Sequence, residues 1–316
     1  MGTLSRHPHY LGALRRRSHR GSKPVVRSHV AHWPEQTHAP VGNRVPEALS
    51  ELGHLGELEA ASRPASAFNI PLNTLNWSDP FHWLALGFRD FTRAPVLGLF
   101  YGTCFVVMGW LLMVVFQQAP AYTMALSAGF LLVGPFMCLG LYEVSQDLSQ
   151  GRVPRFGASL QAWRTRSGQM AIFGGVLLIL EMLWGRVAMI VFILSFEGIP
   201  DFQGSLFKLL NPENLSFIVA YLAVGAFFAG LIYSISVISI PMMLDRQVDA
   251  ITAGLTSLRL VTSQPGVMLL WGALITLLVC VAMAPGFLGL LLVGPLVGHA
   301  SWHAYKASVG PMPKRP

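Results

Sequence analysis

Few side chains in this sequence could do chemistry, and most of these lie in or beside long apolar runs. Glu181 and Arg186 stand inside one such run. Ionisable groups within hydrocarbon are costly, so they are functional hypotheses by default. Five residues apart, the two side chains lie about 140° apart around a helix, which predicts that they do not pair with each other. We expect interhelical ion pairing or snorkelling, with a transport or proton path and catalysis as alternatives.

Two histidines near the end of the chain form the second candidate. His299 and His303 are four residues apart, so a helix places both imidazoles on one face, as in paired metal ligands. Glu143, Asp249 and His303 each follow a proline by eight residues. If related segments surround an axis, these three could converge at the cytoplasmic membrane boundary and hold a divalent metal or relay protons. The alternative is that His303 is an ordinary interfacial residue.

The composition restricts the class of protein. Hydrophobic residues make up 53% of the 316 residues and charged residues 12%, against roughly 25% charged residues in soluble domains. A cytosolic globular enzyme with so little charge would expose large apolar patches. Cys104, Cys138 and Cys280 lie in apolar runs and offer no disulfide framework or CxxC site. The chain is therefore expected to be an all-α integral membrane protein. Its sequence identifies no cofactor and contains no regular nucleic-acid-binding module.

Residues 1–70 are predicted to form a disordered tail, before a membrane domain at 75–310. Seven Arg, one Lys and six His lie in Met1–Arg44, against the single acid Glu35. Such a segment buries too little surface to order itself. Three interpretations stay open: a cytoplasmic tail attracted to anionic lipid or nucleic acid, a start codon placed too early, and a His-based metal tail.

Six apolar runs have the length of a transmembrane helix, about 20 residues. They are Pro95–Phe116, Tyr122–Tyr142, Met170–Phe196, Leu215–Ile240, Val267–Ala284 and Phe287–Tyr305. Only Pro285-Gly286 separates the last two, so a single re-entrant hairpin is the alternative there. The intervening segments on one side carry eleven Lys and Arg, whereas those on the other carry only Lys208. The positive-inside rule then places both termini in the cytoplasm.

An internal repeat divides these runs into three units. Leu-Leu-Val-Gly-Pro occurs at Leu131–Pro135 and again at Leu291–Pro295. Before each pair of runs, apolar residues at i, i+4 and i+7 are followed by an arginine, a pattern typical of an amphipathic helix. The three sets are Phe81, Ala85, Phe88 and Arg89; Phe156, Leu160, Trp163 and Arg164; and Ile251, Leu255, Leu258 and Arg259. We therefore predict three repeats of an amphipathic cytoplasmic helix plus a transmembrane hairpin, with Arg89, Arg164 and Arg259 on lipid phosphates.

Four motifs of the chain are typical of one family: Gly87-Phe88-Arg89-Asp90, Gly140-Leu141-Tyr142-Glu143, Pro241-Met242-Met243-Leu244-Asp245-Arg246 and Gly298-His299-Ala300-Ser301-Trp302-His303-Ala304-Tyr305-Lys306. They resemble the bacterial membrane family called domain of unknown function 2189. The resemblance covers about residues 75–310 and implies a bacterial inner-membrane location, but no activity. Pro241–Ser257 is more distantly similar, in architecture only, to the membrane domain of glycerophosphodiester phosphodiesterases.

Three functions are weighed on these grounds. The first is a non-enzymatic membrane scaffold or assembly module. Its expected partners are the lipid bilayer and anionic phospholipid, and an oligomer or a partner protein is an open alternative. The second is a small-solute or proton transporter or channel with a midplane site near Glu181 and Arg186. The third is a metal- or haem-handling membrane protein that uses His299 and His303. Short, nearly uncharged outer loops argue against a large periplasmic catalytic site.

Overall fold

The computed structural model describes residues 67–118, 123–162, 164, 167–195 and 214–311, without the side chains of 123–132 and 135. The predicted tail up to residue 66 and the charged residues Arg166, Lys208, Lys314 and Arg315 lie outside this part.

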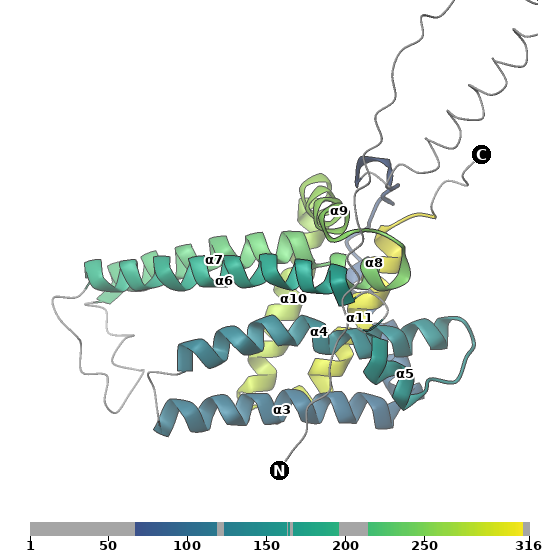
Figure 1. The fold of residues 1–316 in the computed structure, drawn as a ribbon, viewed down its shortest axis with the longest axis horizontal. Helices are drawn as coiled ribbons and strands as arrows, with labels where there is room; N and C mark the ends of the chain where they lie inside the picture. Colours follow the sequence, from purple (N-terminus) through teal and green to yellow (C-terminus); the bar gives the residue numbers. More distant parts are fainter. Residues whose placement is uncertain (1–66, 119–122, 163, 165–166, 196–213, 312–316) are drawn as a thin grey trace, which may run out of the picture. The chain divides into compact units, whose positions relative to one another are not determined.

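The described chain is almost entirely helical (Figure 1). Its elements are η2 (Ala67–Asn69), α2 (Asp79–Arg93), α3 (Pro95–Gln118), α4 (Thr123–Ser149), α5 (Phe156–Gln161), α6 (Ser167–Ser195), α7 (Leu215–Ser236), α8 (Ser239–Asp245), α9 (Ala250–Ser263), α10 (Pro265–Met283) and α11 (Leu290–Ser308). Within the described residues, the β pairing is an isolated bridge between Leu72 and Val309.

Prolines and caps set several helix boundaries. Pro95 and Pro265 start α3 and α10, each after a single residue that ends the preceding helix. Proline suits the first turn of a helix because the N–H it lacks would have no partner there. The Asp249 carboxylate accepts a hydrogen bond from the Thr252 amide and caps α9. Ser78 precedes α2 in the same way, but its side chain makes no capping bond.

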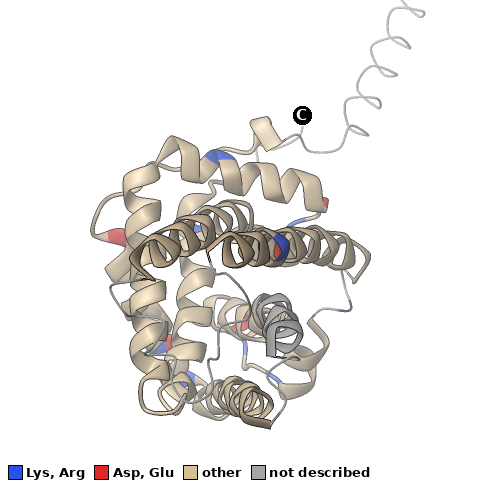
Figure 2. Ribbon diagram, turned by 90° about the vertical axis from the view of Figure 1, so that its left-hand side faces the viewer, with Lys and Arg blue, Asp and Glu red and all other residues tan. Residues whose placement is uncertain are grey.

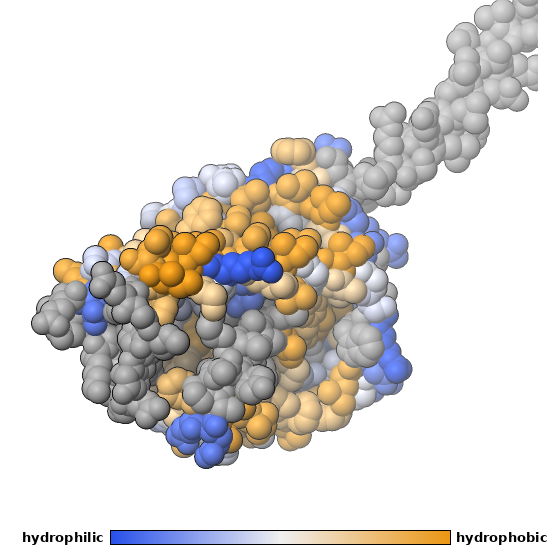
Figure 3. Space-filling view, turned by 60° about the vertical axis from the view of Figure 1, so that its left-hand side comes forward, coloured by the Kyte–Doolittle hydropathy of each residue, from blue (hydrophilic) through white to orange (hydrophobic). Residues whose placement is uncertain are grey.

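Four helical segments among the described residues are long and apolar enough to cross a membrane: Pro95–Gln118, Ser167–Ser195, Leu215–Asp245 and Pro265–Met283. Figure 2 shows how few charged residues these ribbons carry, and Figure 3 shows hydrophobic side chains over much of the visible face. Large apolar residues such as Ile179 and Leu222 lie exposed on these helices. Such surface is stable when lipid covers it.

The four segments coincide with predicted spans one, three, four and five, whereas spans two and six stay predictions. Helices do occupy both positions, as α4 and α11, and a turn at 284–289 separates α10 from α11. Gly286 and Phe287 adopt positive φ there, and the Trp110 indole donates to the Gly286 carbonyl. Polar residues occupy the second half of α11, which weakens its resemblance to a lipid-exposed span.

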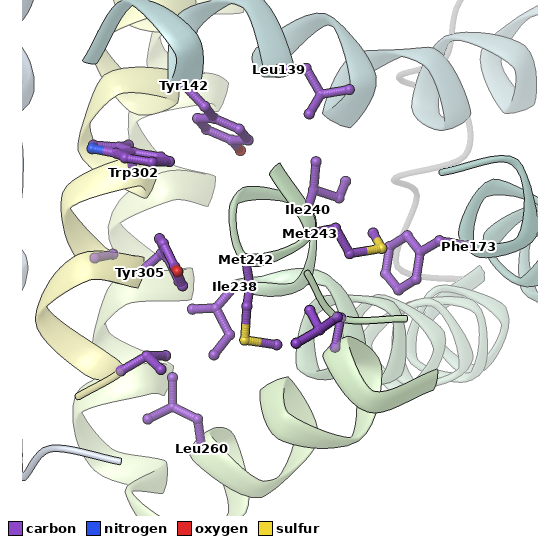
Figure 4. Close-up of a cluster of buried hydrophobic side chains, with 14 of the residues drawn as sticks. Leu139, Tyr142, Phe173, Ile238, Ile240, Met242, Met243, Leu260, Trp302 and Tyr305 are labelled. Carbon is purple, nitrogen blue, oxygen red and sulfur yellow. The ribbon is translucent and has the colours of Figure 1, made fainter. Parts of the chain in front are cut away.

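The buried core lies where α4, α6, α7, α9 and α11 contact the short helix α8, and α10 adds Val267, Met268 and Trp271 to it. Ile238, Ile240, Met242 and Met243 extend from this segment toward the neighbouring helices (Figure 4). They pack among residues that include Leu139, Tyr142, Phe173, Leu260, Trp302 and Tyr305. On α2, Trp83 joins the same core by packing edge-on to Trp271 of α10. Apolar packing therefore already holds α4 and α11 in place at these residues, independently of any polar contact between them.

Packing extends ahead of residue 75, where the membrane domain is predicted to begin. Ile70 is fully buried, and the amide of Asn73 donates to the carbonyl of Ser308. The Arg259 guanidinium donates to the backbone carbonyls of Ala67 and Ile70. Residues 67–74 consequently belong to the folded unit.

Two glycines allow α11 to approach its neighbours closely. A Cβ at Gly87 of α2 would lie 2.7 Å from the amide nitrogen of Ala300, and a Cβ at Gly102 of α3 would overlap the carbonyl oxygen of Leu291. Small residues at such contacts let helix backbones pack closely in membranes. These positions have no room for any side chain.

We predict that Gly102→Ala lowers the free energy of unfolding by about 1–3 kcal/mol, the usual effect of overpacking. The matched control is Gly175→Ala on α6, where a Cβ would meet nothing within 4 Å. Alanine favours a helix over glycine by up to about 1 kcal/mol, so this control should be neutral or stabilising. Thermal unfolding of both detergent-solubilised variants measures the difference, and equal effects would contradict the close approach.

Candidate functional site

A buried carboxylate and a histidine join α2 to α11. The Oδ2 atom of Asp90 lies 2.7 Å from Nε2 of His303. Asp90 is only 2% exposed, and a charge so far from water is tolerated only when it is paired. Gly87 and Ala300, three residues before each partner, form the backbone contact that brings the two side chains together. The close helix approach therefore creates this pair.

A second histidine pair connects α11 to α4. Nδ1 of His299 lies 2.8 Å from Oγ of Ser145, and both residues are fully buried. The other ring nitrogen of His299 has no hydrogen-bond partner among the described residues. The charge of Asp90 acts on both histidines, so Asp90, Ser145, His299 and His303 form one cluster. We call these four residues the α2–α4–α11 polar cluster.

The charge state of Asp90 follows from two opposing effects. Burial alone disfavours the carboxylate and raises its pKa. The hydrogen bond and charge of His303, with smaller contributions from Ser145 and His299, act in the opposite direction and leave the Asp90 pKa below its ordinary value. Asp90 is therefore an anion at neutral pH.

A second polar group lies nearby around Asp245, at the end of α8. Its carboxylate accepts hydrogen bonds from Tyr305 at 2.5 Å, from Lys306 at 3.2 Å and from Gln146 at 3.2 Å. The Arg246 guanidinium donates to the Tyr305 hydroxyl and to the carbonyls of Val309 and Gly310. These contacts tie α8 to α4, α11 and the segment after α11.

The carboxylates predicted to join His303 have other neighbours. Glu143 is half-buried, and its pKa is raised by burial and by the charge of Asp147, although Arg152 opposes both. Asp249 caps α9, and hydrogen bonds from Thr252 keep its pKa low despite the opposing effect of burial. Across the described segments, no group of three or more His, Cys, Asp or Glu residues could hold a metal ion. The structure thus does not bring Glu143, Asp249 and His303 together.

Glu181 and Arg186 lie on different faces of α6. Glu181 shares the buried face with Leu177 and Ala188 and is 8% exposed, whereas Arg186 is exposed. No ion pair joins these two described side chains, in agreement with their angular separation. One carboxylate oxygen of Glu181 is buried and has no hydrogen-bond partner within the described part of the chain.

The three arginines predicted to contact lipid differ in their surroundings. Arg89 and Arg164 are exposed, and Arg164 also lies 3.4 Å from the Gln161 side chain. Arg259 is partly buried and binds the carbonyls of Ala67 and Ile70. This third arginine contributes to the packing of the chain itself.

Sequence reasoning did not select Asp90 and Ser145 as site residues. A signal for Asp90 was present, because Trp83, Gly87 and Asp90 follow the i, i+4, i+7 spacing of one helix face. An acid on the face that carries a tryptophan and a glycine indicates a buried, paired charge. Ser145 offered no comparable signal, since a serine near a helix end is common at surfaces.

We predict that Asp90→Ala and His303→Ala are coupled by about 1.5–3 kcal/mol, as for hydrogen bonds to charged groups. The measurement is a double-mutant cycle on unfolding free energy in detergent. A matched cycle of Glu143→Ala with His303→Ala should give a coupling near zero. Comparable coupling in the two cycles would contradict the assigned pair.

The lowered pKa of Asp90 also predicts how stability depends on pH. The charged carboxylate stabilises the fold above the ordinary aspartate pKa of about 3.9, and this contribution is lost as pH falls through the lowered folded-state value. The stability advantage of the wild type over Asp90→Asn should thus shrink as pH falls into strong acid. Thermal unfolding at acidic pH tests the sign, and an advantage that grows in strong acid would refute it.

Comparison with known proteins bears on residues 123–245, which match the family model "Predicted integral membrane protein (DUF2189)". These residues run from the first residue of α4 to the last residue of α8 and contain Ser145, Glu181 and Asp245. No curated protein and no solved structure matches the chain. The likeness to glycerophosphodiester phosphodiesterases is thus unsupported. Together with the four apolar segments, the family match identifies this chain as an integral membrane protein.

Proposed function

We propose that this chain is a multi-pass protein of the bacterial inner membrane, related to the DUF2189 family beyond residues 123–245, that acts as a non-enzymatic scaffold or assembly module. The observation that carries this proposal is the pairing of Asp90 and Asp245 with groups of the protein itself. A buried charge that is satisfied internally positions helices, and a carboxylate paired in this way is not free to bind substrate.

The order of the elements supports the predicted six-span arrangement. Helices α2, α5 and α9 each precede a pair of longer helices, namely α3 and α4, α6 and α7, and α10 and α11. Arg89, Arg152, Arg246 and Lys306 all lie near the ends that the positive-inside rule assigns to the cytoplasm. In this topology both polar groups lie at the cytoplasmic end of the helices.

A second candidate function is transport of a proton or small solute, favoured by the unpartnered carboxylate oxygen of Glu181. A carboxyl group on the inward face of a membrane helix is a common element of proton paths. Arg186 lies on another face and contributes no partner to it.

Flux measurements separate the two functions. For the module we expect proteoliposomes of the full chain to conduct protons and small solutes no faster than empty liposomes, with Glu181→Gln changing only thermal stability. The matched control, Glu143→Gln, makes the same chemical change in a carboxyl outside the predicted spans. A flux that Glu181→Gln abolishes, while Glu143→Gln retains it and both variants stay folded, would overturn the module in favour of transport.

A further inference from the structure

Helix α2 presents three distinct faces along its length. At about 100° per residue, its side chains fall into three stripes separated by roughly 90–160°. The first stripe contains Trp83, Gly87 and Asp90, is buried, and packs on α10 and α11. A helix that needed only to pack on protein would present water-compatible residues on the remainder of its surface.

The second stripe is apolar and exposed. Phe81, Ala85 and Phe88 lie on one line of the helix, and the two phenylalanines are 54% and 60% exposed. Just before the helix, the Trp77 ring is 64% exposed and lies against Gly266. These exposed aromatic side chains, on and just before one helix, are apolar surface that water does not stabilise.

The third stripe is basic. His82, Arg89 and Arg93 are exposed on a line about 90° from the apolar stripe. Within the described residues, the guanidinium groups of Arg89 and Arg93 form no ion pair. This distinguishes them from Arg259, whose guanidinium is occupied by carbonyls of the chain.

The position of α2 indicates what covers these two stripes. Arg93 ends α2, Ala94 follows, and Pro95 begins α3, which is long and apolar enough to span a membrane. One connecting residue holds the basic end of α2 at the edge of the hydrocarbon layer. An exposed aromatic stripe beside a basic stripe, at that depth, matches acyl chains beside negatively charged headgroups.

We propose that α2 is a binding surface for anionic phospholipid, with Phe81 and Phe88 at the acyl boundary and Arg89 and Arg93 on headgroup phosphate. The inference deepens the proposed membrane module and rests on it for the cytoplasmic location of α2. Arg259 is removed from the expected lipid contacts, because its guanidinium is committed to protein carbonyls.

The test is a titration of the detergent-solubilised full chain by native mass spectrometry with phosphatidylglycerol and with phosphatidylcholine of the same acyl chains. The wild type should bind phosphatidylglycerol more tightly. The double variant Arg89→Gln/Arg93→Gln should lose about fivefold of this preference per arginine, from about 1 kcal/mol for each basic residue near an anionic surface. Circular dichroism and gel filtration check that the variant is folded.

Two further variants make the result specific. Arg89→Lys/Arg93→Lys keeps both charges and should keep the preference, because lysine and arginine are attracted to an anionic lipid surface to a similar extent. Phe81→Ser/Phe88→Ser should weaken binding of both lipids alike. The proposal is overturned if Arg89→Gln/Arg93→Gln retains the preference for phosphatidylglycerol. It is also overturned if the apolar stripe of α2 mediates self-association of the chain that does not depend on lipid. Neither result bears on flux through Glu181, so the proposed function is tested separately.

Discussion

A buried charged group has to find its counterpart inside the protein, and the contact between Asp90 and His303 meets that requirement here. Both side chains come from ends of helices that are distant in sequence. They meet because Gly87 lets the backbone of α2 touch that of α11 at Ala300. Without this close contact between the helices, the Asp90 carboxylate would have no partner. Helix α2 would then lack the contact that turns its aromatic and basic stripes away from the protein. The pair thus fixes both the position and the rotation of α2.

The same logic extends through α11 to the rest of the bundle. His299 reaches Ser145 on α4, and Tyr305 reaches Asp245 on α8, so one helix distributes polar contacts to three others. Apolar packing around Met242 and Met243 supplies most of the buried surface, while these few hydrogen bonds select the rotation of each helix. Lipid-facing helices such as α6 lack this network and expose long apolar rows. The molecule therefore combines a tightly specified end with a surface adapted to solvation by lipid.

Glu181 departs from the internal pairing of Asp90 and Asp245. It faces the protein interior from the middle of an apolar helix, and one of its oxygens has no partner among the described residues. A structural module gains nothing evident from such a group, which is why transport stays the second candidate. Asp90 and Asp245, in contrast, are paired with groups of the protein. The scaffold function therefore depends on these two residues, and the transport function on Glu181.

The sequence by itself determined the class of protein, the apolar runs, the helix start at Pro95, and the amphipathic character of the segments around Phe81 and Ile251. These properties follow from local composition, spacing and the missing N–H of proline, which are all written along the chain. The partner of each polar group was decided only by the tertiary structure. His303 bonds to Asp90 rather than to Glu143 or Asp249, and Arg259 to carbonyls rather than to lipid. Such choices depend on which helix faces touch, and that depends on close packing at particular glycines between segments some two hundred residues apart.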